Sequence, residues 1–236
     1  MTGAAARRER GRQEMREQIL DAARRIVQEE GVDALSMRAV ARAIGYSPAA
    51  LYEYFPAKED VFDALYFEGS EGLNGRMRDA MAALPPDASS TETFAHLGRA
   101  YRAYALDQPE LYRLALGATA KTAPGPPPGK EAEGFNVIVE AARRAVERGD
   151  FAPLPPPVIA IASWSAVHGF VSLELAGILT GGPGPGAPPP SAAEGRAARD
   201  AMFEALIRVT LFGYMVRPEA PPGPSIDGLR SGVAGP

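Results

Sequence analysis

The sequence predicts an all-α protein. Apolar residues recur at spacings of three and four along almost every ordered stretch, no stretch alternates strictly enough to indicate a strand, and Gly and Pro divide the chain into helix-sized segments. With 46% apolar residues among 236 positions, the chain can bury a core in one or two domains. We therefore expect a series of packed helices separated by proline-rich loops.

The first expected helix carries one apolar stripe and ends at a glycine. Met15, Ile19, Ala22 and Ile26 fall at helical spacing, and Gly31 can terminate the helix. The residues before it, 1–12, are rich in arginine. We expect them to form a flexible basic arm, and a solvated terminus is the simpler alternative.

Residues 35–58, LSMRAVARAIGYSPAALYEYFPAK, encode two short helices that meet at a glycine turn. Ser36 can cap the first helix, which Gly45 ends. Ser47 can cap the second, with Pro48 in the first helical position, where its missing N–H costs nothing.

The second helix is expected to be only about two turns long, because Pro56 disfavours helical geometry at the residue before it. Two short helices joined in this way are typical of a helix-turn-helix DNA reader. The first helix would brace this reader, and together they would form a DNA-binding domain over residues 13–60.

The rest of the chain is expected to form a second helical domain over residues 61–216, followed by a disordered tail at 217–236. Two proline-rich stretches, at 121–130 and 181–190, predict loops. Further helices are expected to begin near Lys58, Thr91 and Leu111 and to occupy 131–148, 158–180 and a last segment from Ser191.

Composition excludes several kinds of site. The chain has no cysteine and only two histidines, so we expect no disulfide, no metal site and no cofactor. A net charge of -4 means that any contact with nucleic acid must use a local basic surface. The N-terminus lacks the apolar core of a signal peptide, which predicts a cytoplasmic protein.

The segment 158–180 is long and apolar enough to be tested as a membrane span. It contains Glu174, His168 and several serines. These suit a helix buried in protein better than one that faces lipid, so we expect no membrane association.

Residues 15–58 resemble the TetR family of transcriptional regulators. The resemblance rests on the apolar first helix, the glycine that ends it, and the 35–58 stretch. WSAVHG, at residues 164–169, is similar to the Trp-His-Gly (WHG) signature of one class of C-terminal domain in this family. The resemblance implies a homodimeric repressor that binds palindromic operator DNA and is released by a small-molecule effector, with its two C-terminal helices forming the dimer interface.

The resemblance also implies which residues contact DNA. Arg38 matches a position that often reaches a base, and a guanidinium suits the two acceptors of guanine; an ordinary solvated arginine is the alternative. Lys58 matches a lysine that grips phosphate. The implied contacts of the second helix, the recognition helix, are Ser47, Ala49, Ala50, Tyr52, Glu53 and Tyr54.

Three positions depart from the family pattern. Glu53 stands where many relatives have an aromatic residue, Tyr54 replaces a frequent histidine, and Ala57 replaces the usual polar cap. The Glu53 carboxylate could accept from cytosine, point into solvent or pair with Arg42. Tyr52 and Tyr54 are two residues apart, so they cannot face the same way; one could touch bases and the other phosphate.

The candidate effector site combines aromatic walls with a few hydrogen-bonding tips, which predicts an apolar or aromatic effector. Trp164 and His168 are four residues apart, so they share a helix face and could either orient a ligand or only pack. The full candidate set is Tyr101, Tyr104, Tyr112, Phe135, Trp164 and His168.

The sequence also bears on two other classes of function, an enzyme and a protein-interaction module. An enzyme is disfavoured because the sequence has no phosphate-binding glycine loop, no metal-ligand cluster and no catalytic triad at a recognisable spacing. A helical protein-interaction module with a vestigial helix-turn-helix is the remaining alternative. The presence of Arg38, Tyr52 and Lys58 argues against it.

Overall fold

The computed structural model describes residues 3–116, 133–179 and 190–215. The loop expected at 121–130, residues 181–189 of the second loop and the tail at 217–236 lie outside this range. The described residues are 80% helical and form no β-strand, only an isolated bridge between Phe151 and Met215. The all-α prediction is therefore confirmed.

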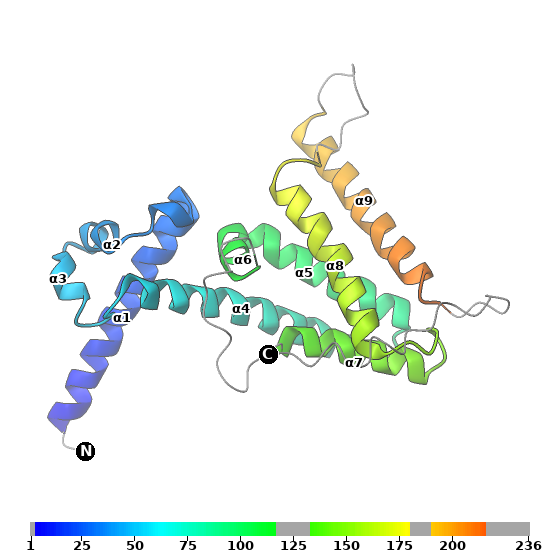
Figure 1. Cartoon of the computed structure of the whole chain (residues 1–236), viewed down its shortest axis with the longest axis horizontal. Coiled ribbons are helices and arrows are strands. Elements are labelled where there is room, and N and C mark those ends of the chain that lie inside the picture. Colours follow the sequence, from blue (N-terminus) through cyan, green and yellow to red (C-terminus); the bar gives the residue numbers. More distant parts are fainter. Residues whose placement is uncertain (1–2, 117–132, 180–189, 216–236) are drawn as a thin grey trace.

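The N-terminal domain consists of three helices and a short 3-10 turn, seen at the left of Figure 1. The elements are α1 (Gly3–Glu30), η1 (Val32–Ala34), α2 (Met37–Ile44) and α3 (Pro48–Leu51). The expected start and stop signals of α2 are present. The Ser36 side chain accepts from the Ala39 N–H at 3.1 Å, and Gly45 adopts φ 75°, which only glycine takes without strain.

The expectation of a flexible arm at residues 1–12 is wrong for the described part of it, because α1 begins at Gly3. The sequence of this segment explains the difference: alanine, arginine and glutamate are all good helix formers and extend the helix from its packed part toward the N-terminus. Figure 1 shows this end of α1 projecting beyond the other N-terminal helices.

Helix α3 is shorter than expected. Ser47 caps it through the Ala50 N–H at 3.2 Å and Pro48 opens it, but regular helix stops at Leu51. The next backbone bonds run from Glu53 to Ala50 and from Tyr54 to Leu51, a tighter i to i−3 pattern. Residues 52–54 therefore lie on a turn after the helix.

Helix α4 (Lys58–Ala82) begins where expected and belongs to both domains. Its first turns supply Val61 and Leu65 to the N-terminal core, whereas Leu73 and Met77 lie in the C-terminal core. The domain boundary that we expected at residue 60 is therefore misplaced: one continuous helix crosses from one core to the other (Figure 1).

The C-terminal domain is a bundle built on the second half of α4. Helix α8 ends at Leu175, five residues before the expected end, because Gly177 adopts φ 71°. Helices α8 and α9 pack against each other at the right of Figure 1. The remaining helices are α5 (Ser90–Asp107), α6 (Pro109–Leu116), α7 (Glu133–Glu147), α8 (Pro156–Leu175) and α9 (Ala192–Phe212).

Two glycines of α4 allow close helix packing. A Cβ on Gly69 would lie 2.7 Å from the carbonyl oxygen of Leu111 on α6, and one on Gly72 would lie 2.7 Å from the hydroxyl of Tyr104 on α5. Gly75, one further turn along α4, has open space, with the Arg78 side chain as its nearest neighbour at 3.8 Å.

We expect Gly69→Ala to destabilise the protein by about 1 to 3 kcal/mol, because the added methyl meets backbone that cannot move aside easily. The matched control, Gly75→Ala, should stabilise it by about 0.5 to 1 kcal/mol through helix propensity alone. Chemical denaturation monitored by circular dichroism measures both. Equal changes for the two variants would show that α4 and α6 are not in close contact at Gly69.

Candidate DNA-reading face and aromatic network

The residues expected to read DNA lie largely on the surface of the N-terminal domain. Arg38 on α2 is exposed, as are Ser47 and Ala49 at the start of α3, whereas Ala50 is half-buried. Leu51, with 1% of its surface exposed, anchors the same helix in the core. A short helix with one buried anchor and small residues on its outer side leaves its outer surface open to a partner.

The two tyrosines after α3 point in different directions. Tyr52 is 48% exposed, whereas Tyr54 is half-buried and packs against the N-terminal core. Glu53 between them is exposed, and the structure gives it no ion pair with Arg42. Tyr54 is therefore less available to DNA than Tyr52, because its ring already contributes to packing.

Lys58 is exposed at the first position of α4. Ala57 cannot cap this helix with its side chain, and its backbone N–H instead donates to the Asp60 carboxylate at 2.7 Å. The family's polar cap is thus replaced by an acid three residues further on. This leaves the Lys58 ammonium free to meet an anion near the helix N-terminus, where anions are favoured.

Arg12 and Arg16 support the end of the reader, a role that our sequence reasoning missed. Arg16 donates to the carbonyl oxygen of Tyr54, and Arg12 donates to that of Glu53 at 3.5 Å. The Arg16 guanidinium also lies 4.0 Å from the centre of the Phe55 ring. The spacing of four between the two arginines, on the helix that braces the reader, is the signal that could have indicated this.

Four of the six candidate effector residues come together in the C-terminal domain. Trp164 and His168 lie on α8, Tyr101 on α5 and Tyr112 on α6. The Trp164 indole N–H donates to the Tyr101 hydroxyl at 3.1 Å, and the two tyrosine hydroxyls are 3.2 Å apart. Both hydroxyls lie near His168 Nδ1, that of Tyr112 at 2.7 Å and that of Tyr101 at 3.0 Å.

The donor and acceptor properties of the four side chains limit how their hydrogen bonds can run. The indole of Trp164 can only donate, so Tyr101 accepts from it. In one arrangement that satisfies all four side chains, the Tyr101 hydroxyl donates to the Tyr112 oxygen. Tyr112 then donates to His168 Nδ1, the shortest contact of the set. In this arrangement His168 is neutral with its proton on Nε2, 3.5 Å from the Ser172 hydroxyl.

The other two candidate residues are not part of this hydrogen-bonded network. The Tyr104 hydroxyl donates to the Gly69 carbonyl at 2.8 Å, which fixes α5 to α4 and gives Tyr104 a packing role. Phe135 contributes only its ring, 6.0 Å from that of Trp164. With Tyr101 and Tyr112 at 3% and 2% exposure, the hydroxyls bind one another and the site is closed.

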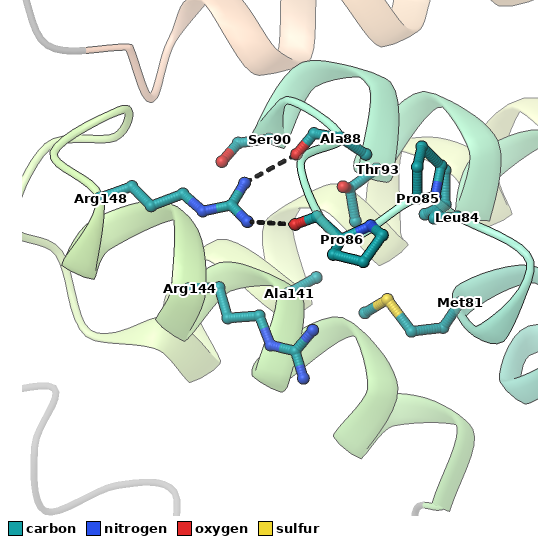
Figure 2. Close-up of a pocket in the computed structure, with 10 residues that line it drawn as sticks. All are labelled: Met81, Leu84, Pro85, Pro86, Ala88, Ser90, Thr93, Ala141, Arg144 and Arg148. Atoms are coloured by element: carbon teal, nitrogen blue, oxygen red, sulfur yellow. Dashed lines mark hydrogen bonds between the residues drawn. The ribbon is translucent and has the colours of Figure 1, made fainter.

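A separate hollow of about 70 Å³ lies near the junction of α4, α5 and α7 (Figure 2). Arg148 closes one side by donating to the Ala88 and Pro86 carbonyl oxygens at 2.7 and 3.2 Å. None of the candidate effector residues lines it. Its volume is well below the roughly 300 Å³ at which small-molecule pockets begin, so it does not match the expected effector site.

The fold and these sites define a class: a helix-turn-helix DNA-binding domain joined by one helix to a helical sensor domain. Residues 19–65 match the family described as "Bacterial regulatory proteins, tetR family", and residues 94–209 match "Tetracyclin repressor-like, C-terminal domain". The chain therefore belongs to the TetR family of transcriptional regulators. Regulators of this family bind operator DNA and small-molecule effectors and form dimers.

Individual relatives agree with this assignment. The chain is 42% identical over 77 residues to the HTH-type transcriptional repressor Rv1474c of Mycobacterium tuberculosis, a match that covers 29% of this chain and 41% of that protein. The alignments with the E. coli regulator UidR likewise cover only 37% of that protein. The chain thus spans well under two thirds of the length of these curated relatives.

Solved structures match over most of the chain. A regulatory protein, SCO4313, is 30% identical with a TM-score of 0.66, and the match covers 86% of this chain and 98% of that one. A structure described as a possible TetR family transcriptional regulator from Streptomyces coelicolor A3(2) is 26% identical with a TM-score of 0.58, covering 84% and 97% of the two chains.

The His168 network gives a pH prediction. Burial lowers the pKa of His168 below its ordinary value of 6.5, so the unfolded chain takes up a proton at a higher pH than the folded one does. Its stabilising contribution is complete above that ordinary pKa and is lost as the pH falls through the lower folded pKa.

We expect wild-type protein to lose more thermal stability than His168→Asn between about pH 7.5 and 5, because asparagine keeps an acceptor near Nδ1 but does not titrate. The melting temperature of both proteins across this range measures the difference. Both proteins share every other side chain, so a difference between the two curves belongs to position 168. A constant difference between the two curves would contradict a neutral, network-bound His168.

Proposed function

We propose that this protein is a ligand-responsive transcriptional repressor that binds a palindromic operator as a homodimer and is released by a small apolar or aromatic effector. The observation that carries the proposal is the pairing of an exposed reader with a hydrogen-bonded aromatic network that includes α6, a helix that also contributes Leu114 to the N-terminal core. The exposure of Arg38, Tyr52 and Lys58 favours DNA reading over the protein-interaction alternative.

Helix α6 supplies a route between the two sites. Tyr112 belongs to the hydrogen-bonded network, and Leu114, two residues further along, is fully buried in the N-terminal core. The carbonyl of Leu111, the residue before Tyr112, lies against Gly69 of α4. An effector that separates Tyr112 from His168 would therefore move α6 against α4 and shift the reader.

The proposed DNA contacts divide by chemistry. Arg38 reads bases, with Ser47, Ala49, Ala50 and Tyr52 lining the groove and Lys58 binding phosphate. Glu53, exposed and without a cation partner in the structure, faces the duplex edge or solvent. Tyr54 contributes least, because its ring packs against the core.

The proposed dimer interface is formed by α8 and α9. Both carry large apolar side chains exposed to solvent, more than a single soluble chain would be expected to leave uncovered on adjacent helices. A second copy that packs its own α8 and α9 against them would make a four-helix interface. These side chains are Ile161, Leu173, Met202 and Val209.

Helix α8 is also long and apolar enough to cross a membrane, by length and composition only. Its Glu174 carboxylate is buried and paired with Arg102 on α5 at 2.7 Å and with Arg199 on α9 at 3.2 Å. A helix tied through a buried ion pair to two neighbours fits a protein interface better than lipid. We accordingly place the protein in the cytoplasm, with no membrane partner.

The C-terminal domain is proposed to belong to the Trp-His-Gly class. Trp164 and His168, the first two residues of that signature, both join the hydrogen-bonded network. Gly169 has no neighbouring atom within 4 Å of where its Cβ would stand, so close packing does not explain the glycine.

For Arg38→Ala we expect a loss of about 1 to 3 kcal/mol that falls mainly on the specific site, because a base contact is lost. Lys58→Ala should weaken binding to every sequence and flatten its salt dependence, because a phosphate contact is lost. Fluorescence anisotropy with a selected operator and a scrambled duplex measures both. Equal losses on the two duplexes for Arg38→Ala would show that Arg38 does not read bases.

We expect Val209→Glu to convert the dimer to monomers, because it places a charge at a position that is 73% exposed in one chain and covered in the proposed interface. The control is Leu106→Glu on α5, an apolar residue 44% exposed but outside α8 and α9. Sedimentation velocity at micromolar concentration distinguishes the species. A dimer that survives Val209→Glu would refute this interface.

A further inference from the structure

The N-terminal part of α1 extends beyond both the domain core and the family match. The first residue of α1 in the buried core is Ile19, which is also where the match to the TetR DNA-binding family begins. Among the described side chains, those of residues 5–12 contribute to neither core. Ten helical residues span about 15 Å, so this segment, which we call the helical arm, projects well clear of the domain.

The helical arm is the basic part of an acidic protein. It carries four arginines and one acid, Glu9, in a chain whose net charge is -4. Arg7, Arg8, Arg10 and Arg12 are all exposed, and within the described residues the first three form no ion pair. A cluster of exposed arginines without ion pairs indicates a surface that binds an anionic partner.

The spacing of the arginines directs part of this charge toward the reader. Arg8, Arg12 and Arg16 follow one another at intervals of four and therefore share a broad helix face. Arg12 donates to the carbonyl oxygen of Glu53 and Arg16 to that of Tyr54, at the end of the reader. Arg8 stands one turn further out on the same face, beyond the end of the reader, with no partner there.

We propose that the helical arm binds the sugar–phosphate backbone of the duplex that flanks the segment read by α3, and that Arg8 makes the phosphate contact. This inference rests on the proposed function. A guanidinium can bind phosphate through two parallel hydrogen bonds, and any duplex that meets α3 continues past the reader's end. Because Arg12 and Arg16 hold the arm to the reader, Arg8 would stand beside that duplex before binding.

The test uses the full chain and a duplex selected by it from random-sequence DNA, prepared with long flanks and with the flanks trimmed. Binding constants are measured across a series of salt concentrations. Arg8→Ala should lower the salt slope on the long duplex by about 0.9 per protomer and weaken binding several-fold at moderate salt. On the trimmed duplex, Arg8→Ala and wild type should bind alike.

The chain offers a matched control in Arg10→Ala. It removes the same charge from the same arm, about 160° around the helix from Arg8 and Arg12, and should change the slope much less. Arg8→Lys should recover most of the lost slope, because phosphate also accepts an ammonium. Alanine is a good helix former, so these variants keep the arm helical, which circular dichroism verifies.

Three results would overturn the proposal. If Arg8→Ala and Arg10→Ala lower the slope equally, the arm acts only as diffuse charge. If Arg8→Lys behaves like Arg8→Ala, the arginine reads a groove and not the phosphate backbone. If trimming the flanks leaves the effect of Arg8→Ala unchanged, the contact is not with flanking DNA.

Failure of the proposed function would give a different result. Wild-type protein would then show no preference for any selected duplex over unrelated DNA.

Discussion

The close contact between α4 and α6 at Gly69 is the constraint on which the rest of the structure depends. Helix α4 runs unbroken through both cores, so the N-terminal domain cannot tilt without moving a helix of the C-terminal domain. The missing side chain at Gly69 lets the Leu111 backbone approach, and Leu114 of the same helix enters the N-terminal core. Packed interfaces of this kind switch between discrete arrangements more readily than they deform gradually.

The same contact explains why the aromatic network is placed where it is. Tyr112 lies on α6 next to Leu111, so its hydrogen bond to His168 ties α6 to α8 at the point where α6 meets α4. Trp164 can only donate, so Tyr101 accepts from it, and one consistent set of bonds then runs from Tyr101 through Tyr112 to His168. Burial lowers the pKa of His168 and so favours the neutral imidazole, whose Nδ1 accepts from Tyr112 in this arrangement.

The parts of the fold that were predictable from the sequence are those controlled by near neighbours along the chain. Ser36, Ser47 and Gly45 act within three or four residues, so their caps and turn follow from spacing alone. The inward packing of Tyr54, the bond from Tyr104 to Gly69 and the crossing of α4 between two cores depend on contacts distant in sequence. Spacing brought Trp164 and His168 together, but their partners on α5 and α6 required the tertiary structure.

An acidic chain that binds DNA must concentrate its positive charge and also hold it in position. A flexible basic tail would lose conformational entropy on each encounter, at a cost of about 1 to 2 kcal/mol for every backbone residue ordered. In this protein the arginines lie on a helix already anchored to the reader by Arg12 and Arg16, so most of that ordering precedes binding. The anchoring bonds also satisfy carbonyl groups at the end of the reader, which links the shape of the reading surface to the placement of the charge beside it.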